Sequence, residues 1–303
     1  MVSSETIKFG ELNHGGLNKA PLVKTNTCLF INLSNFPFQS SCMRNRVTLS
    51  TIILLLFHLS ISAQNKSNKL VWRDEFNYNG LPDSTKWNYD IGGDGWGNNE
   101  LQYYTKKRKE NCRVQNGKLI IEARKEDFEG KNYTSARLVS RGKGDWKYGK
   151  LEVRAKIPSG LGTWPAIWML ASTTPLNWPD DGEIDIMEHV GWNPYYIHAS
   201  IHCKKYNHVI HTQRTDTVIV KNAFEQFHVY GVEWDAEKLQ ISIDGIVYFQ
   251  FKNEHSGYDA WPFDNKMHLL LNVAVGGNWG GSKGVDSTIW PKRMEVDWVR
   301  MYQ

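Results

Sequence analysis

The stretch Lys150-Leu-Glu-Val-Arg-Ala-Lys-Ile157 alternates polar and apolar side chains at every position. Successive side chains of a β-strand point to opposite faces of the sheet, so this period of two predicts a strand with one buried and one solvated face. A surface helix would repeat its apolar residues every three or four positions instead. The stretch therefore indicates an antiparallel sheet that covers a core on one side.

The chain from Leu70 to Gln303 continues this rhythm, and no segment of ten residues has a convincing helical period. Two apolar runs flank Asp244-Gly245, which is a strong signal for a two-residue hairpin. Further strands are predicted at 119–123, 197–202, 227–234, 239–243, 246–251, 268–273 and 295–302, and we assign Trp298 in the last of them to the core. Many short strands with Gly, Asn and Asp between them predict one all-β domain, an antiparallel sandwich or barrel, over residues 64–303.

The apolar run from Thr51 to Ile61 is too short to span a bilayer comfortably. Arg44 and Arg46 precede it and small residues up to Ala63 follow, the order of a secretory signal peptide. We therefore interpret residues 43–63 as a signal peptide cleaved near Ala63. We interpret residues 1–42 as a disordered leader upstream of Met43, which we take as the true initiator. This predicts a secreted protein, extracellular or periplasmic, with no membrane span in its mature part.

The formal charge of +4 arises almost wholly in the first 63 residues, which hold five basic and two acidic side chains. The remainder has 31 basic (36 minus 5) and 30 acidic residues (32 minus 2), without a clustered basic excess, so we expect no nucleic-acid partner. We expect a monomer. Two cysteines, Cys112 and Cys203, remain in the mature part, and the sequence leaves open whether they form a bridge.

Three carboxylates lie within six residues in Gly182-Glu-Ile-Asp-Ile-Met-Glu188. On a regular strand Glu183 and Asp185 share a face, whereas strict alternation would bury Glu188. Burying an unpaired carboxylate is costly. We therefore predict a β-bulge near Ile186-Met187, which turns Glu188 onto the face of the other two.

Three like charges on one face repel, so at least one carboxyl must hold a proton near neutral pH. Glycoside hydrolysis uses such a pair, an ionised carboxylate and a protonated carboxyl. Placement on one strand favours the retaining separation of roughly 5–5.5 Å over the wider inverting one. A solvated acidic edge and a calcium site built from carboxylates are the alternatives.

The segment Gly182–Glu188 resembles the catalytic signature of glycoside hydrolase family sixteen, in its laminarinase-like branch with one extra residue. Gly95-Trp-Gly-Asn-Asn-Glu-Leu-Gln-Tyr-Tyr104, Gly162-Thr-Trp-Pro-Ala-Ile-Trp-Met169 and Val273-Ala-Val-Gly-Gly-Asn-Trp-Gly280 are similar to the same branch and follow its order. The resemblance covers Leu70 to Gln303. It implies a β-jelly-roll sandwich of two curved antiparallel sheets with a concave substrate cleft.

The resemblance also implies roles for the three acids: Glu183 as nucleophile, Glu188 as acid/base, and Asp185 as the residue that tunes the nucleophile. Sugars offer apolar C–H faces to aromatic rings, while their hydroxyls seek hydrogen-bond partners. The candidate platforms are Trp164, Trp178 and Trp279. The candidate polar contacts are Asn98, Glu100, Arg137, His202 and Asn272.

No cofactor is expected for catalysis. The resemblance implies a structural calcium on the convex side, at Glu75, Gly117 and Asp297. The histidines at 198, 202, 208 and 211 match no His-Glu-x-x-His pattern, so we expect no zinc site.

The resemblance implies a retaining endo-β-1,3-glucanase whose partner is a β-glucan polysaccharide. A mixed-linkage β-1,3-1,4-glucanase and a galactan hydrolase are alternatives on the same fold. Binding a sulfated galactan would need cations in the cleft, and the segments quoted above supply mainly Arg137. A non-catalytic glucan-binding module is the alternative of another class, and retention of all three carboxylates disfavours it.

Overall fold

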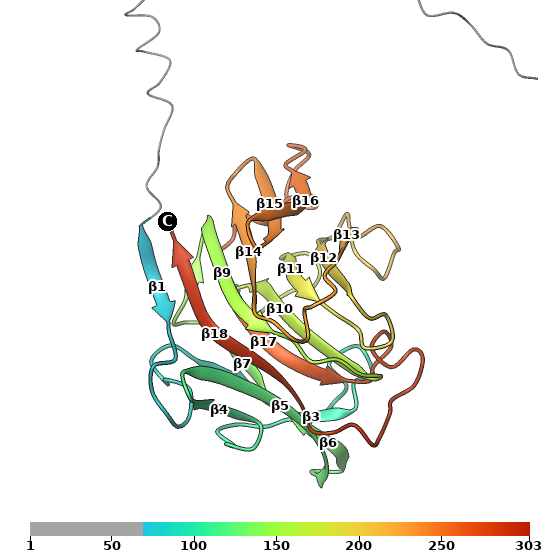
Figure 1. Ribbon diagram of the computed structural model, residues 1–303. Helices are drawn as coiled ribbons and strands as arrows, with labels where there is room; N and C mark the ends of the chain where they lie inside the picture. Colours follow the sequence, from blue (N-terminus) through green and yellow to red (C-terminus); the bar gives the residue numbers. More distant parts are fainter. Residues whose placement is uncertain (1–68) are drawn as a thin grey trace, which may run out of the picture. The chain divides into compact units, whose positions relative to one another are not determined.

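The computed structural model describes residues 69–303, and these fold into two stacked sheets (Figure 1). The predicted leader and signal peptide lie outside the described residues. The first sheet has ten strands, in the order β16 (Ile246–Lys252), β15 (Lys238–Ile243), β14 (His228–Trp234), β9 (Gly149–Lys156), β18 (Lys292–Tyr302), β5 (Lys118–Phe128), β6 (Lys131–Ser135) and β3 (Gln102–Tyr104), with β1 (Leu70–Asp74) on β18 and β4 (Cys112–Gln115) on β5.

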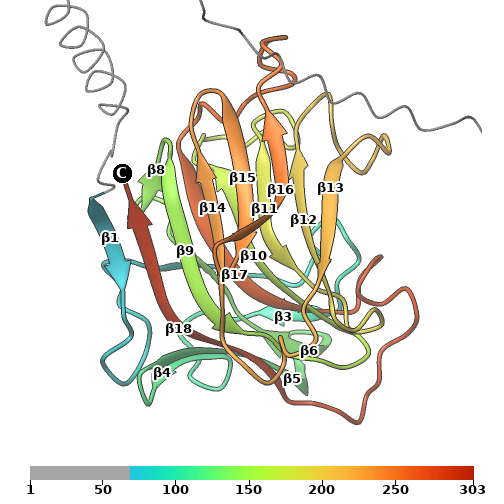
Figure 2. The same ribbon diagram turned by 45° about the horizontal axis from the view of Figure 1, so that its top comes forward.

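The second sheet has eight strands, in the order β13 (Arg214–Ile219), β12 (Tyr196–His202), β11 (Glu183–Glu188), β10 (Thr163–Ala171), β17 (Met267–Val275), β7 (Arg137–Val139) and β2 (Asn88–Asp90), with β8 (Asp145–Trp146) on β17. Its pairs are antiparallel throughout. Figure 2 shows β14, β15 and β16 of the first sheet lying over β11, β12 and β13 of the second.

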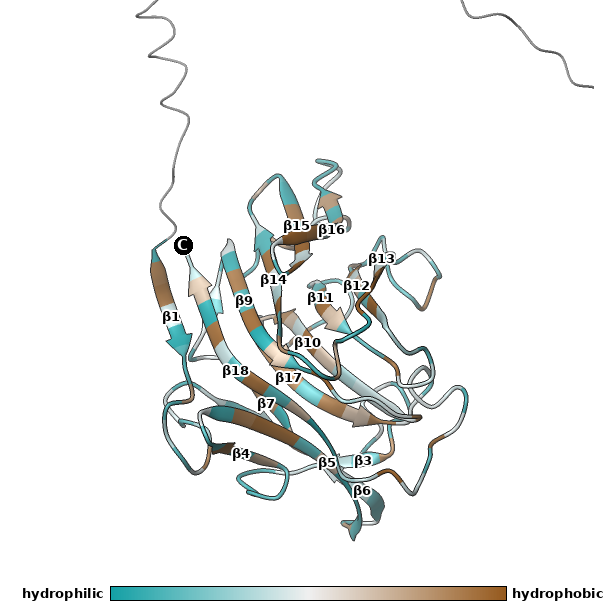
Figure 3. Cartoon of the chain, in the orientation of Figure 1, coloured by the Kyte–Doolittle hydropathy of each residue, from teal (hydrophilic) through white to brown (hydrophobic). Residues whose placement is uncertain are grey.

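Residues 150–156 of this stretch belong to β9, near the middle of the ten-stranded sheet between β14 and β18, and Ile157 follows the strand. Leu151, Val153 and Ala155 are fully buried, while the side chains between them face outward. Figure 3 shows this alternation of apolar and hydrophilic residues along β9. The predicted hairpin joins β15 and β16, and both Asp244 and Gly245 have the positive φ that its tight turn requires.

The core lies between the two sheets. From the eight-stranded sheet, β10 and β17 send every second side chain into it, including Ile167, Met169, Leu269 and Leu271, all at 0% exposure. The side chains between them point to the opposite face of that sheet, which is the face that carries Glu183, Asp185 and Glu188. A sandwich core thus fixes which residues of these strands face the open side.

The assignment of Trp298 to the core is wrong. The pairing of β18 with β9 shifts register between Val296 and Trp298, and Asp297 and Trp298 are both only partly buried. The guanidinium of Arg300 lies 4.1 Å from the centre of the Trp298 ring. The bulge interrupts the alternation on which the assignment depended.

Cys112 and Cys203 are both buried free thiols. No helix within residues 69–303 is long and apolar enough to cross a membrane.

Candidate active site

The three carboxylates occupy one face of β11, in the middle of the eight-stranded sheet. Glu183 and Glu188 are partly exposed, and Asp185 between them is 3% exposed. On the opposite face Ile184, Ile186 and Met187 are fully buried in the core. Glu188 therefore departs from the strict alternation of a regular strand.

The pairing register contains the predicted β-bulge. Asp185 pairs with Ser200 and Glu188 pairs with His198, so one residue of β12 faces two of β11. On the other side, β10 pairs Trp168 with Asp185 and the preceding Ile167 with Met187, which passes over Ile186. Ile186 is thus the extra residue, and its insertion turns Glu188 outward.

The register sets the neighbours of each carboxylate. Glu188 lies beside Ala166, Asp185 beside Trp168 and Glu183 beside Leu170. Ala166 in turn pairs with Asn272 of β17. The small side chain of Ala166 leaves open space next to Glu188.

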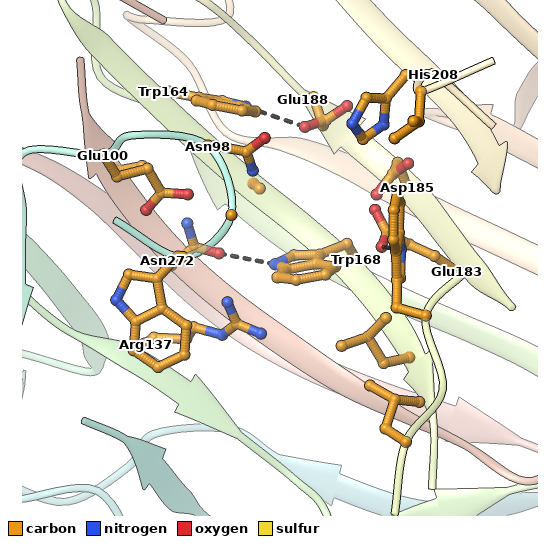
Figure 4. Close-up of a pocket in the computed structure, with 18 residues that line it drawn as sticks. Asn98, Glu100, Arg137, Trp164, Trp168, Glu183, Asp185, Glu188, His208 and Asn272 are labelled. Carbon is orange, nitrogen blue, oxygen red and sulfur yellow. Dashed lines mark hydrogen bonds between the residues drawn. The ribbon is translucent and has the colours of Figure 1, made fainter. Parts of the chain in front are cut away.

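A cavity of about 320 Å³ lies over this face, within the range of small-ligand sites. Figure 4 shows Glu183, Asp185 and Glu188 on one side of the cavity and Glu100 and Arg137 on the other. An extended chain lying between them would pass directly in front of the carboxylates.

Two of the three predicted tryptophan platforms hold the catalytic candidates. Nε1 of Trp164 donates a hydrogen bond to Oε1 of Glu188 at 3.0 Å, and Nε1 of Trp178 donates to Oε2 of Glu183 at 2.6 Å. Both rings line the cavity. Trp279 lies outside the lining and packs edge-on against Trp164, with 5.5 Å between ring centres, so it supports that ring from behind.

Four of the five predicted polar contacts line the cavity: Asn98, Glu100, Arg137 and Asn272. Asn272 accepts a hydrogen bond from Trp168 at 2.7 Å, and the Arg137 guanidinium lies over the rings of Trp96 and Trp168 at 4.7 and 4.5 Å. Burial raises the pKa of Glu100.

The fifth, His202, lies outside the lining. Its Nε2 is 3.3 Å from Oδ2 of Asp185, so it contacts the acid rather than the open cavity.

The surroundings raise the pKa of two of the three carboxyls. Burial, followed by the charge of Asp185, holds the pKa of Glu188 well above its usual range, and the Trp164 hydrogen bond opposes this only in part. Burial, followed by the charge of Glu183 and a hydrogen bond with it, holds the pKa of Asp185 well above its usual range. The raised pKa favours the protonated form of Glu188, which is the form that a general acid needs.

Sequence reasoning missed Trp96, Trp168 and His208, which line the cavity. Trp168 follows Trp164 by four residues on β10 and shares its face, so the alternation could have identified it. His208 belongs to the loop after β12, which has no period to reveal its direction. Its ring lies 5.2 Å from that of Trp178.

The residues proposed for calcium are engaged elsewhere. Oε1 and Oε2 of Glu75 each accept a hydrogen bond from Arg300 at 2.9 Å, and Asp297 is paired with Arg154. Gly117 lies in the turn between β4 and β5. As they lie, these side chains do not fit a calcium site, because both carboxylates are neutralised by guanidinium groups. The site stays a prediction that thermal unfolding with and without added calcium tests.

Within residues 69–303, one group of acidic and histidine side chains is close enough to share a metal ion: Glu183, Asp185 and His202. This group lies in the carboxylate site itself. We therefore assign it to the acid chemistry of that site.

Three carboxyls on one face of a strand, two of them with raised pKa values, in a cavity lined by tryptophan rings, define the machinery of a glycoside hydrolase. The model for glycosyl hydrolases family 16 matches residues 99–300, and the chain belongs to this family. It is 51% identical over 265 residues to the β-glucanase of Rhodothermus marinus, covering 83% of this chain and 93% of the relative.

A second relative, the glucan endo-1,3-β-glucosidase of Cryptopygus antarcticus, is 36% identical over 252 residues, covering 77% of this chain and 91% of the relative. The crystal structure of the laminarinase from Rhodothermus marinus superposes with a TM-score of 0.77 at 54% identity, covering 78% of this chain and 97% of that one. The predicted jelly roll and the prediction of a glycoside hydrolase are thereby confirmed.

Proposed function

We propose that this protein is a secreted, retaining endo-β-1,3-glucanase that hydrolyses laminarin-type β-glucans by double displacement. The observation that carries the proposal is the bulge of β11, which places Glu183 and Glu188 on one face with Asp185 between them. The relatives named above as a laminarinase and an endo-1,3-β-glucosidase support the linkage. The relative named as an endo-acting glucosidase supports attack within a chain rather than at its end.

In the first step the carboxyl of Glu188 donates its proton to the glycosidic oxygen as the bond to the anomeric carbon breaks. The carboxylate of Glu183 attacks that carbon from the opposite side and forms a covalent glycosyl-enzyme. The Trp178 hydrogen bond to Glu183 holds the nucleophile in place.

In the second step Glu188, now ionised, takes a proton from a water molecule as that water attacks the anomeric carbon. The bond to Glu183 breaks and its carboxylate is restored. Two inversions at the same carbon give net retention. Asp185, whose pKa is raised beside Glu183, supports the change of charge on the nucleophile during the cycle.

Glu183→Gln tests the chemistry, because it removes the nucleophile and keeps the shape. We expect hydrolysis of laminarin to fall by several orders of magnitude while glucan binding is largely kept. Glu233→Gln, an exposed glutamate on β14, is the matched control. Near-native turnover by Glu183→Gln, or early products of inverted configuration by NMR, would contradict the mechanism.

Laminarin, lichenan and agarose assayed side by side test the linkage. We expect laminarin to be the best substrate. A preference for lichenan would make the protein a mixed-linkage glucanase, and a preference for agarose would make it a galactan hydrolase.

Export is tested separately by N-terminal sequencing of the protein recovered outside the cell. We expect the mature chain to begin just after Ala63. A chain that still carries residues 1–42 would contradict the assignment of the signal peptide.

A further inference from the structure

A second cavity, of about 520 Å³, opens beside β2 and β7 at the edge of the eight-stranded sheet. Four cationic side chains line it: Lys106, Lys107, Arg141 and Lys143. Lys106 and Lys107 follow β3, and the other two follow β7, so two separate loops bring them together. We call this cavity the basic pocket.

The basic pocket adjoins the active-site cavity, because Asp90 of its lining pairs with Arg137 of the cavity lining. Val139 lines the pocket and belongs to one apolar cluster with Leu170 and Leu270, against which Trp168 and Trp178 pack. Leu170, Trp168 and Trp178 line the active-site cavity. A glycan in the cleft that extends past Trp168 therefore meets the basic pocket next.

An ion pair marks the boundary between the two cavities. Arg137 lines the active-site cavity, Asp90 lines the basic pocket, and Nε of Arg137 lies 3.0 Å from Oδ2 of Asp90. Asp90 is the one acidic residue in the pocket lining, and Arg137 offsets its charge.

The positive charge of the pocket is not neutralised within the described chain. Residues 69–303 place no carboxylate within ion-pair distance of Lys106, Lys107 or Arg141. Lys143 is fixed by the carbonyl oxygen of Trp87 at 2.8 Å and by Oδ1 of Asn88 at 2.7 Å. Because the chain after residue 63 is nearly neutral, this concentration of cations is a local feature.

We propose that the basic pocket binds an anionic group, a carboxylate or a sulfate, on a sugar residue of the same glycan whose neutral part occupies the cleft. Lys106 and Lys107 act as mobile point charges, and the guanidinium of Arg141 offers a fork that fits two oxygens of one anion. This proposal rests on the proposed function in one respect only, which is the linkage of the glycan. It makes acid-substituted β-glucans preferred ligands.

Calorimetry on the Glu183→Gln protein tests the proposal, since we expect that variant to bind glucan without turning it over. The ligands are three matched β-1,3-glucan oligosaccharides: neutral, partly oxidised at C6 to glucuronate, and partly sulfated. Each Kd is measured at about 0.01 M and about 1 M salt, where the Debye length is roughly 30 and 3 Å. Two further proteins add Lys106→Gln with Arg141→Gln, or, as a control of equal charge, Lys125→Gln with Lys221→Gln.

We expect an anionic chain to bind roughly three- to tenfold more tightly than the neutral chain at low salt, from a few solvent-screened charge contacts. High salt should remove the gain. So should Lys106→Gln with Arg141→Gln, whereas the control pair should keep it. A gain for the sulfated chain alone identifies sulfate as the ligand, and a gain for the oxidised chain alone identifies carboxylate.

Equal or weaker binding of both anionic chains would overturn the proposal, as would a gain that survives high salt or the loss of Lys106 and Arg141. The salt dependence of the parent protein answers the question even if the double variant fails to fold. Hydrolysis of neutral laminarin by the native protein tests the proposed function independently. If the native protein fails to hydrolyse laminarin but anionic chains still bind more tightly, the proposed β-1,3 linkage is wrong and the proposed anion binding by the basic pocket still stands.

Discussion

The hydroxyl of Tyr248 donates a hydrogen bond to the carbonyl oxygen of Ile186 at 3.2 Å, across the two sheets. Ile186 is the extra residue of the β11 bulge. Tyr248 is likewise the extra residue of a register shift in β16, because β15 pairs Ile241 with Phe249 and Ser242 with Val247. Two irregular positions in opposite sheets are therefore tied together, and the tie holds the backbone that turns Glu188 toward the cleft.

Tyr248→Phe removes this hydrogen bond and keeps the ring. We expect kcat to fall about tenfold, equivalent to about 1.4 kcal/mol in the barrier, because Glu188 would be less well aimed. KM should change little, since Tyr248 does not line the cavity. Steady-state kinetics on laminarin measure both.

Tyr230→Phe is the matched control, because its buried hydroxyl on β14 has no hydrogen-bond partner among the described residues. Its kcat should stay at the native value. An equal loss in both variants would mean that the Tyr248 effect is general loosening of the core.

Asp185→Asn keeps the volume and a hydrogen-bonding group beside Glu183 and removes the titrating proton. We expect kcat/KM to fall by about 10²–10⁴-fold, less than for Glu183→Gln. The charge of Asp185 helps raise the pKa of Glu188, so its removal should move the basic limb of the pH–rate profile to lower pH. An unchanged rate and profile would make Asp185 a structural strand residue only.

The sequence predicted the bulge of β11 because a regular strand would have buried Glu188 at a prohibitive cost. Charge therefore revealed an irregularity that alternation alone would have missed. Trp298 shows the converse: a second bulge in β18 carries no charged residue in a costly position, so nothing in the pattern warned that alternation would fail.

The residues contributed by loops could not be predicted for a different reason. His208, Lys106 and Arg141 reach their cavities only because the sheets place distant loops side by side. A loop has no period that fixes the direction of a side chain. Trp168, on a regular strand with Trp164, was within reach of the same reasoning that selected Trp164.

The raised pKa values of Glu188 and Asp185 predict a pH-dependent stability. An unfolded carboxyl titrates at about 4, below the folded value, so the native state binds more protons between the two. The free energy of unfolding should then be highest below the unfolded pKa and fall as pH rises through the folded pKa. Glu188→Gln removes one such group and should flatten this fall.

Thermal unfolding at about pH 5 and about pH 9 measures the effect. The Tm of Glu188→Gln relative to native should rise at the higher pH, by roughly 2–4 °C for each kcal/mol recovered in a domain of this size. Glu233→Gln, which alters an exposed glutamate, should track the native protein at both pH values. A Tm difference for Glu188→Gln that shrinks with pH would contradict the raised pKa.

Trp164→Phe tests how one donor sets the working pH range. The Trp164 hydrogen bond stabilises the ionised form of Glu188 and so lowers its pKa, against burial and the charge of Asp185. Phenylalanine keeps an apolar ring in the cleft and removes the donor. The pKa of Glu188 should rise, so the acid stays protonated to higher pH and the basic limb of kcat/KM should move upward by about one pH unit. Trp279→Phe, which alters the ring behind Trp164 without touching Glu188, should leave that limb in place. If the basic limb of the kcat/KM profile does not shift in Trp164→Phe, a group other than Glu188 provides the proton.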